Sequence, residues 1–292
     1  MLGGAMCRAE VMGLAAEPQT LVSAPFPCHP EIAWPDSHSR WLCCPACGTR
    51  VRSEPVPADV YGNDYPAARG HHNPAVGRCK ALTLERWLAE LGITIAGRTV
   101  CEIGFGGAAG LAALQARGAT VLGLEPVPAN RAHAQLLGIP REHVFDVDPL
   151  PTLPRKPDLW LLQDSFEHIP DPNTLVQWMA RESAPSARVL LVAPDARSVS
   201  RRLMGPLWLH EVPDHRIHYS RAGVASIFAR AGFHIVKAFR PVKLVSLGMA
   251  LSHLRVLAGA PAVARQGRRD GVRVWFNLGE MGLLLQRDDG RR

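Results

Sequence analysis

The sequence predicts an α/β fold in which a mostly parallel sheet is flanked by helices. Short apolar segments alternate with amphipathic segments along residues 99–239, a pattern typical of strand–helix–strand units. Glycines follow the amphipathic segments, as at Gly118, Gly138 and Gly232, and glycine is the usual residue just past a helix. Such units join parallel strands by right-handed crossovers, so helices should cover both faces of the sheet.

The length and composition favour one main domain with a small appendage. The chain has 292 residues, of which 47% are hydrophobic and 20% are charged, and this length can bury a full core. We expect no transmembrane helix, because no window holds about 18 uninterrupted apolar residues. The seven cysteines are too dilute for a disulfide scaffold and odd in number, which favours a reducing compartment such as the cytoplasm.

Three regions are expected along the chain. Residues 1–27 lack clear periodicity and are predicted to form a flexible leader. Residues 28–80 combine cysteines, histidines and prolines and are predicted to form a small Cys- and His-containing module. Residues 81–292 carry the strand–helix alternation, with an insertion at about 241–273 before the last strand.

The elements of the main domain can be assigned in order. The first is a helix that begins near Ala81 and stops at Gly92, since its leucines and its tryptophan follow helical spacing. Asp171 and Pro172 supply the N-cap and the first-turn proline of a later helix. The expected strands are 99–103, 120–124, 143–147, 159–163, 188–193, 233–239 and one within 274–285. The other expected helices are 108–116, 129–137, 171–182 and 220–231.

The loop after the first strand is the most informative part of the sequence. Gly104 and Gly106 allow a tight turn and a close approach of a ligand to the backbone. Glu125 follows Gly104 by about 20 residues, where a carboxylate can bind ribose hydroxyls. With Ala109, these glycines also fit a loose dinucleotide motif, so they leave a nicotinamide cofactor and S-adenosylmethionine both open. Glu102 favours S-adenosylmethionine, because a carboxylate attracts the ammonium group of that cofactor and would repel the pyrophosphate of a nicotinamide cofactor.

Four motifs in this order carry a family resemblance. They are Glu102-Ile-Gly-Phe-Gly106, Gly123-Leu-Glu-Pro126, the segment 161–172, and the segment 213–220 with its following Ala231-Gly-Phe233. They resemble the class I S-adenosylmethionine-dependent methyltransferases, in particular the ubiquinone-type and small-molecule O-methyltransferases. The resemblance covers roughly residues 80–240. It implies a Rossmann-like fold with seven strands, and methyl transfer to a small-molecule acceptor such as a sugar, a lipid or a natural product.

The resemblance also implies roles for single residues. Glu102 would lie near the methionine ammonium, Glu125 would take the ribose hydroxyls, and Asp146 is the candidate for the adenine amino group. Gln163 and Asp164 would end the fourth strand beside the methyl group. The implied cofactor residues are therefore Glu102, Gly104, Gly106, Glu125, Asp146, Gln163 and Asp164.

A general base is needed only if the acceptor loses a proton during transfer. His168 and His215 are the candidates, because the pKa of an imidazole suits proton transfer near neutral pH. His218 is a third. Glu167 is expected to orient His168 or to bind a basic surface residue. A purely structural hydrogen bond is the alternative role for each histidine.

The motif Cys44-Pro-Ala-Cys47 provides two of the four ligands that zinc prefers. It resembles the small zinc-binding modules that precede some methyltransferase domains. The residues that could complete a site are Cys28, His29, His38 and Cys43. The alternative is a small module that holds unligated thiols.

Other features leave the partner and the reaction less defined. The net charge is +7, but no nucleic-acid module accompanies it, so a nucleic-acid partner is not favoured. The segments 61–65 and 69–72 could cover the cofactor or simply pack as a linker. The apolar segment 203–210 could form a lid or, equally, a packing loop. Two alternative functions stay open: an NAD(P)-dependent oxidoreductase, and a non-catalytic protein that binds S-adenosylmethionine. The oligomeric state cannot be deduced from the sequence.

Overall fold

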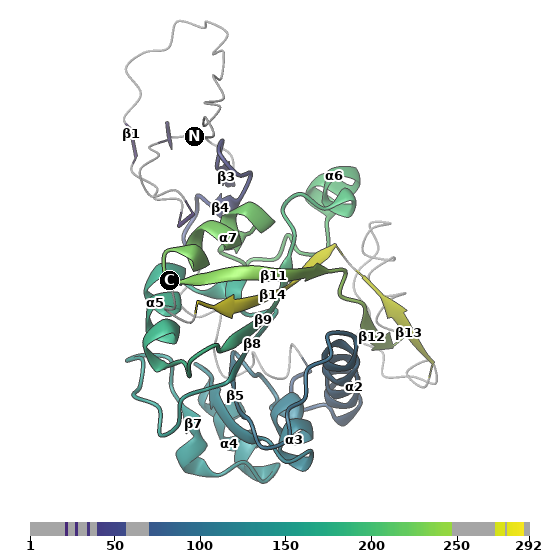
Figure 1. Cartoon of the computed structure of the whole chain (residues 1–292). Helices are drawn as coiled ribbons and strands as arrows, with labels where there is room; N and C mark the ends of the chain where they lie inside the picture. Colours follow the sequence, from purple (N-terminus) through teal and green to yellow (C-terminus); the bar gives the residue numbers. More distant parts are fainter. Residues whose placement is uncertain are drawn as a thin grey trace, which may run out of the picture.

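A seven-stranded sheet forms the centre of the computed structural model, with strands in the order β11-β14-β9-β8-β5-β6-β7 (Figure 1). The structure describes residues 21–22, 27–28, 34–35, 40–56, 70–246, 272–277 and 279–288. The strands are β5 (Thr99–Ile103), β6 (Thr120–Leu124), β7 (Val144–Phe145), β8 (Leu159–Gln163), β9 (Arg188–Pro194), β11 (Phe233–Phe239) and β14 (Glu280–Arg287). β5 to β9 are parallel, and β14 is antiparallel to both of its neighbours. The predicted α/β class with a mostly parallel sheet is confirmed.

The direction in which strands are added reverses between β5 and β8. From β5 the chain adds β6 and β7 on one side, and it then crosses to add β8 and β9 on the other. Ligands of open α/β sheets bind beyond the carboxyl ends of the strands at such a reversal. The loops after β5 and β8 are therefore where a site is expected.

Helices cover both faces of the sheet. α2 (Pro74–Glu90), α3 (Ala109–Ala116) and α4 (Pro128–Leu136) contribute to one cluster of buried side chains, and α5 (Pro172–Glu182) and α7 (Arg221–Ala229) contribute to the other. Successive strand residues alternate between the two, since Leu161 belongs to one cluster and Leu162 to the other. This alternation follows from the two-residue period of a strand that is buried on both faces.

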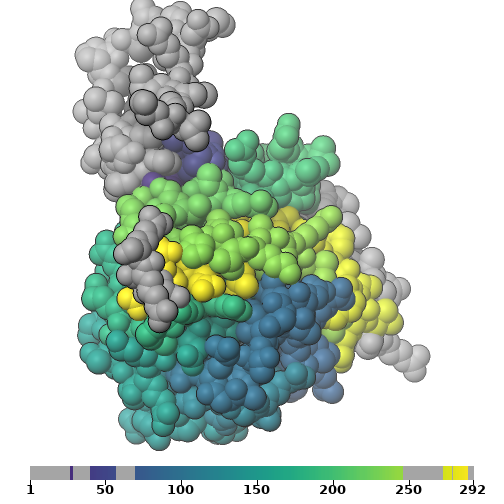
Figure 2. Space-filling view, in the orientation of Figure 1, coloured from purple at the N-terminus to yellow at the C-terminus, as the bar shows by residue number. Residues whose placement is uncertain are grey.

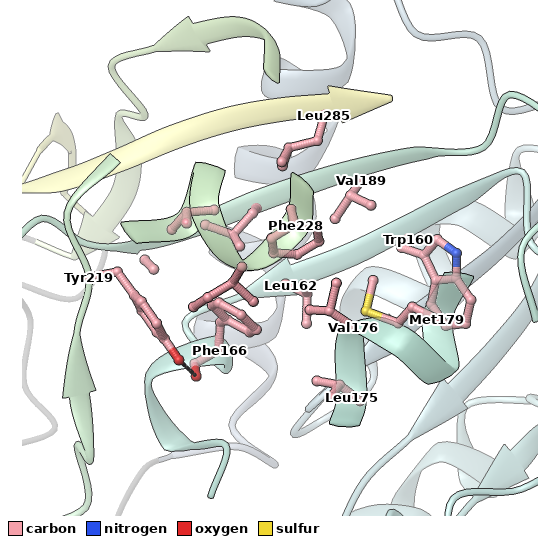
Figure 3. Packing of buried hydrophobic residues seen from close by; sticks show 14 of the residues in the cluster. Trp160, Leu162, Phe166, Leu175, Val176, Met179, Val189, Tyr219, Phe228 and Leu285 are labelled. Atoms are coloured by element: carbon pink, nitrogen blue, oxygen red, sulfur yellow. Dashed lines mark hydrogen bonds between the residues drawn. The ribbon is translucent and has the colours of Figure 1, made fainter. Parts of the chain in front are cut away.

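Aromatic rings fasten the loop after β8 to the larger cluster (Figure 3). Phe166 stacks on Tyr219 with ring centroids 4.5 Å apart, and it lies 5.5 Å from the ring of Phe228. The Tyr219 hydroxyl donates to the carbonyl oxygen of Phe166 at 3.4 Å. Such aromatic pairs add about 0.5–1.5 kcal/mol each beyond their buried area. They hold the short 3₁₀ helix η3 (Phe166–His168), and with it His168, against the sheet.

The N-terminal part of the chain adds a small sheet to the main domain. β3 (Trp41–Cys43) pairs with β4 (Arg50–Arg52), and β4 pairs in turn with β10 (Ile217–His218). Figure 2 shows the described N-terminal residues in contact with the C-terminal half of the chain. We call β3 and β4 the N-terminal ribbon.

The bounds predicted for the last strand are wrong. β13 (Arg273–Phe276) pairs with β12 (Lys243–Ser246) in a separate two-stranded ribbon, and only β14 joins the central sheet. Gly279 lies between β13 and β14 and has a φ of +99°, a backbone conformation that residues other than glycine rarely adopt.

Other bounds differ less. The first helix begins at Pro74 rather than near Ala81, because Asn73 caps it by accepting from the Ala75 N–H and proline suits a first turn. The third strand is shorter than predicted, since the 3₁₀ helix η2 (Arg141–His143) precedes it. The segment 203–210, for which a lid and a packing loop were both open, is divided among α6 (Val199–Met204), the 3₁₀ helix η4 (Gly205–Leu207) and a buried Trp208.

Some predictions lie outside the described residues. These are most of the leader 1–27, His29, His38, the segment 61–65 and residues 247–271 of the insertion. None of the helices in the described ranges has the length and apolar character that crossing a membrane requires.

Candidate active site

The backbone after β5 passes so close to its neighbours that it requires glycine. Gly104 has a φ of +74°, and a Cβ there would lie 2.6 Å from the Cβ of Ser165, in the loop after β8. Gly106 has a φ of +57°, and a Cβ at Gly107 would overlap the carbonyl oxygen of His71. The glycine loop is thus enclosed by the segment after β8 and by the segment before α2.

Glu102 lies at the reversal of strand order. It is 5% exposed, and Gln163 of β8 donates to its Oε1 at 2.8 Å. Its Oε2 has no hydrogen-bond partner among the residues that the structure describes. Burial raises the pKa of Glu102 to about 7. A buried carboxylate oxygen without a partner is costly, and the ammonium group of an amino-acid-like ligand would satisfy it.

Glu125 follows β6 and joins the glycine loop to α4. Its Oε2 accepts from the Gly106 N–H at 2.8 Å, and its Oε1 accepts from the Val127 N–H and from Asn130 Nδ2, both at 3.1 Å. Burial raises the pKa of Glu125, and these three donors oppose that rise. The predicted ribose-binding carboxylate is therefore fixed beside the predicted glycine loop.

Asn130 is a residue of this site that the sequence did not indicate. It is fully buried, and its amide lies 3.0 Å both from His71 Nδ1 and from His72 Nε2. The His72 ring stacks on His133 at 4.1 Å, and His133 Nδ1 lies 3.2 Å from the carbonyl oxygen of Gly107. His71 and His72 are therefore tied to Glu125 and to the glycine loop through Asn130 and His133.

The other predicted cofactor carboxylates lie at the ends of β7 and β8. Asp146 is exposed and pairs with Arg131 at 2.9 Å, and Arg131 also donates to the carbonyl oxygen of Glu125 at 2.6 Å. Asp164 has a φ of +51° and pairs with Lys243 at 2.6 Å. The four strand ends β5 to β8 therefore carry all seven predicted cofactor residues along one edge of the sheet.

Lys243 was not predicted because it lies in the insertion, on β12. It contacts Asp164 at 2.6 Å and Glu280 of β14 at 2.8 Å. Burial raises the pKa of Asp164, but the charge of Lys243 outweighs it and the net direction is down. Burial lowers the pKa of Lys243, but the charges of Asp164 and Glu280 raise it by more, so its net pKa is above the ordinary value. Asp164 is therefore held ionised at the end of β8.

The two histidines predicted as bases meet in the structure. The rings of His168 and His215 are 4.7 Å apart, and His168 Nδ1 lies 2.9 Å from the carbonyl oxygen of Asp214. The third candidate, His218, lies 3.3 Å from His215 through its Nε2. Burial lowers the pKa of His218, and the charge of Arg50 lowers it further. His218 is thus kept neutral beside His215.

Glu167 lies next to His215, with 3.8 Å between its Oε1 and His215 Nε2. It is 1% exposed, and neither carboxylate oxygen has a hydrogen-bond partner within the described ranges. Burial first, and then the charge of Asp164, raise the pKa of Glu167 well above its ordinary value. Glu167, His168 and His215 each place one potential metal-ligand atom, a carboxylate oxygen or a ring nitrogen, within 4.8 Å of the other two. This group can share a proton or hold a cation.

Three cysteines form a separate cluster. The sulfurs of Cys28, Cys44 and Cys47 lie within 4.8 Å of one another, and all three residues are buried. The structure therefore brings the predicted pair together with one of the residues expected to complete it. Cys43, another of those residues, is exposed and does not join the cluster.

Comparisons with known proteins identify the family of the chain. A family model described as "Methyltransferase domain" matches residues 76–238. A ubiquinone biosynthesis O-methyltransferase of Klebsiella pneumoniae (strain 342) is 28% identical over 167 residues, which cover 55% of this chain and 63% of that protein. Another, from K. pneumoniae subsp. pneumoniae, is 30% identical over 109 residues, covering 35% and 45%. The match thus spans about half the length of these relatives.

Among solved structures, the magnesium protoporphyrin IX methyltransferase of Synechocystis PCC 6803 with bound SAH is similar in fold. It is 15% identical, covers 79% of this chain and 97% of its own, and gives a TM-score of 0.50. At this identity the likeness concerns the fold, and it confirms the Rossmann-like architecture predicted from the motifs.

Proposed function

The chain belongs to the methyltransferase-domain family, and from that premise we propose that it transfers the methyl group of S-adenosylmethionine to a small-molecule acceptor. The observation that carries the proposal is the buried Glu102 carboxylate beside the glycine loop, one oxygen of which has no partner among the residues that the structure describes. It fits the ammonium group of this cofactor and would repel the pyrophosphate of a nicotinamide dinucleotide. The curated relatives are named O-methyltransferases, so the proposed acceptor is a hydroxyl of a sugar, a lipid or a natural product.

The residues of the chain act mainly by positioning. S-adenosylmethionine, when bound, supplies a methyl group already activated by its sulfonium. Glu125 would accept from the ribose hydroxyls, Asp146 from the adenine amino group, and Glu102 from the ammonium. Gln163 holds Glu102 in place across the reversal of strand order. Alignment of reacting groups can supply about 7–11 kcal/mol of barrier lowering.

The acceptor hydroxyl must lose its proton when the new bond to carbon forms. We assign this proton to the pair His168 and His215, which lie together beside the end of β8. Glu167, neutral because of burial, borders His215 and limits the charge that collects there. Asp164 stays ionised through Lys243 and can accept a hydrogen bond from an acceptor hydroxyl.

Calorimetry across pH tests the cofactor assignment. We expect S-adenosylhomocysteine to bind with an affinity that rises by up to tenfold per unit between about pH 5.5 and 7 and is level above that. Glu102, with its pKa near 7, must lose a proton before it can pair with the ligand ammonium. The variant Glu102→Gln should bind more weakly and show a flat profile.

The same titration includes reduced nicotinamide cofactor as the competing ligand. Binding of that cofactor alone would reject the proposal in favour of an oxidoreductase. A screen of hydroxyl-bearing acceptors with a labelled methyl donor addresses the remaining alternative. Cofactor binding without transfer to any member of a broad panel would favour a non-catalytic binding protein.

Single-turnover methyl transfer tests the histidine pair. We expect His168→Gln or His215→Gln, or both, to slow the chemical step by about 10²-fold, the usual scale for the loss of a general base. Cofactor affinity should change little, because the contacts described above for the two histidines are with Asp214, Glu167 and His218. His234→Gln is the matched control, since His234 is 55% exposed and pairs with Asp288 away from this cluster. Equal rates in all variants would remove the assignment of a base.

A further inference from the structure

The cysteine cluster takes no part in the proposed methyl transfer and does not depend on it. Its three buried residues come from two places, with Cys44 and Cys47 in the loop between β3 and β4 and Cys28 upstream of β3. We propose that Cys28, Cys44 and Cys47 bind one zinc ion that fastens the N-terminal ribbon to β10 and α7.

The spacing of the sulfurs fits an ion better than a disulfide. Zinc holds thiolates at about 2.3 Å in a tetrahedral arrangement, so its sulfur ligands lie about 3.8 Å apart. The sulfurs of Cys28 and Cys47 are 3.4 Å apart, and all three sulfurs lie within 4.8 Å of one another. A disulfide would require about 2.05 Å. Three thiolates leave one tetrahedral position for water or another ligand.

Polar groups surround the sulfurs as they do around a bound metal. The Thr49 hydroxyl lies 3.3 Å from the Cys47 sulfur. Gly48, with a φ of +78°, lets the chain turn so that its N–H donates to the carbonyl oxygen of Cys44 at 2.7 Å. Polar groups around a bound thiolate fix its direction toward the metal.

The cluster is built into α7 as well as into the ribbon. The Thr49 hydroxyl accepts from the Ser220 N–H at 3.2 Å, and a Cβ on Gly223 of α7 would overlap this hydroxyl. The carbonyl oxygen of Cys28 accepts from Ser226 at 2.7 Å and from Arg230 at 3.1 Å. An ion bound here would therefore join an upstream segment, the ribbon and α7.

The N-terminal ribbon also contacts the loop that carries His215. β4 pairs with β10, and Arg52 of β4 donates to the carbonyl oxygens of His215 at 2.9 Å and of Val212 at 2.7 Å. Trp41 of β3 stacks on His218 at 4.0 Å. The ion would have a structural role, and it would affect His215 and His218 through the N-terminal ribbon.

Metal content of the full chain, purified under reducing conditions, tests the site. We expect about one zinc ion per chain by elemental analysis, with most of it lost in Cys44→Ser, Cys47→Ser and Cys28→Ser. Cys43→Ser is the matched control, because Cys43 is adjacent in sequence but exposed, and it should keep its zinc. Cobalt substituted into the wild-type protein should show the sulfur-to-metal charge-transfer band and the intense visible bands of a tetrahedral thiolate site.

Thermal unfolding gives a second readout. A metal that binds only the folded state raises Tm, so a strong chelator should lower the Tm of the wild-type protein and of Cys43→Ser but not that of a folded cluster variant. Wild-type protein without zinc or a cobalt–thiolate band after metal loading would overturn the proposal, even if the variants fail to fold. So would zinc retained in the cluster variants, or a Cys28–Cys47 disulfide in unreduced protein. S-adenosylhomocysteine affinity, measured alongside, reports separately on the proposed function.

Discussion

Replacing Glu125 with alanine is expected to weaken the binding of S-adenosylhomocysteine by about 100-fold, or roughly 3 kcal/mol. Hydrogen bonds to a charged group contribute about 1.5–3 kcal/mol each, and a ribose offers two hydroxyls to this carboxylate. The loss is compounded because Glu125 also holds the Gly106 N–H and the Asn130 amide in place. Calorimetry at pH 7.5 measures the change directly.

Glu142→Ala is the control for this experiment. Glu142 is an exposed carboxylate on η2, and its removal changes the net charge by the same amount. Circular dichroism should show that both variants keep their helices. Equal affinity in Glu125→Ala and in the wild-type protein would mean that this carboxylate only organises the loop, and the ribose assignment would fail.

Gly104→Ala is expected to lower the free energy of unfolding by about 2–5 kcal/mol and to abolish measurable cofactor binding. Alanine at a φ of +74° is strained, and its Cβ would lie 2.6 Å from the Cβ of Ser165. That atom cannot rotate away, because it is attached directly to the backbone. The glycine loop or the loop after β8 must therefore shift. Urea unfolding and calorimetry measure the two effects.

Gly92→Ala separates strain from collision. Gly92 has a similar φ of +65°, but no atom of the described part of the chain lies within 4 Å of a Cβ at that position. We expect it to cost only about 1–2 kcal/mol, the strain of a left-handed alanine, and to leave cofactor affinity unchanged. If both variants lost the same stability and both bound cofactor, the close packing of the glycine loop would have no functional meaning.

Periodicity predicted most of the fold because the sheet is buried on both faces. Runs such as 120–124 and 159–163 coincide with β6 and β8, since a continuous apolar segment of that length has few other uses in a chain of this kind. The bounds predicted for the last strand are wrong because an apolar segment alone does not show which sheet it joins. β13 and β14 both contain apolar residues, and what distinguishes them is the pairing partner and the burial that follows from it, neither of which is encoded locally.

The common location of the proposed cofactor residues could be predicted because these residues lie at strand ends. Glu102, Glu125 and Gln163 each follow or close a strand that motif and spacing identify. Asn130 and Lys243 could not be predicted in this way. Asn130 lies on α4 rather than at a strand end, and it donates from there to Glu125. Lys243 contacts Asp164 from a position 79 residues further along the chain. Long-range contacts of this kind depend on the packed fold rather than on local pattern.

The pairing of β4 with β10 bears on how acceptor preference could be re-engineered. A chimera in which only the segment 211–218 comes from another enzyme would keep β4, Arg52 and Trp41, but these would face a segment that does not match them. Grafts that transfer the two stretches as a matched set should preserve the backbone of the recipient, whereas single-stretch swaps should yield poorly folded hybrids.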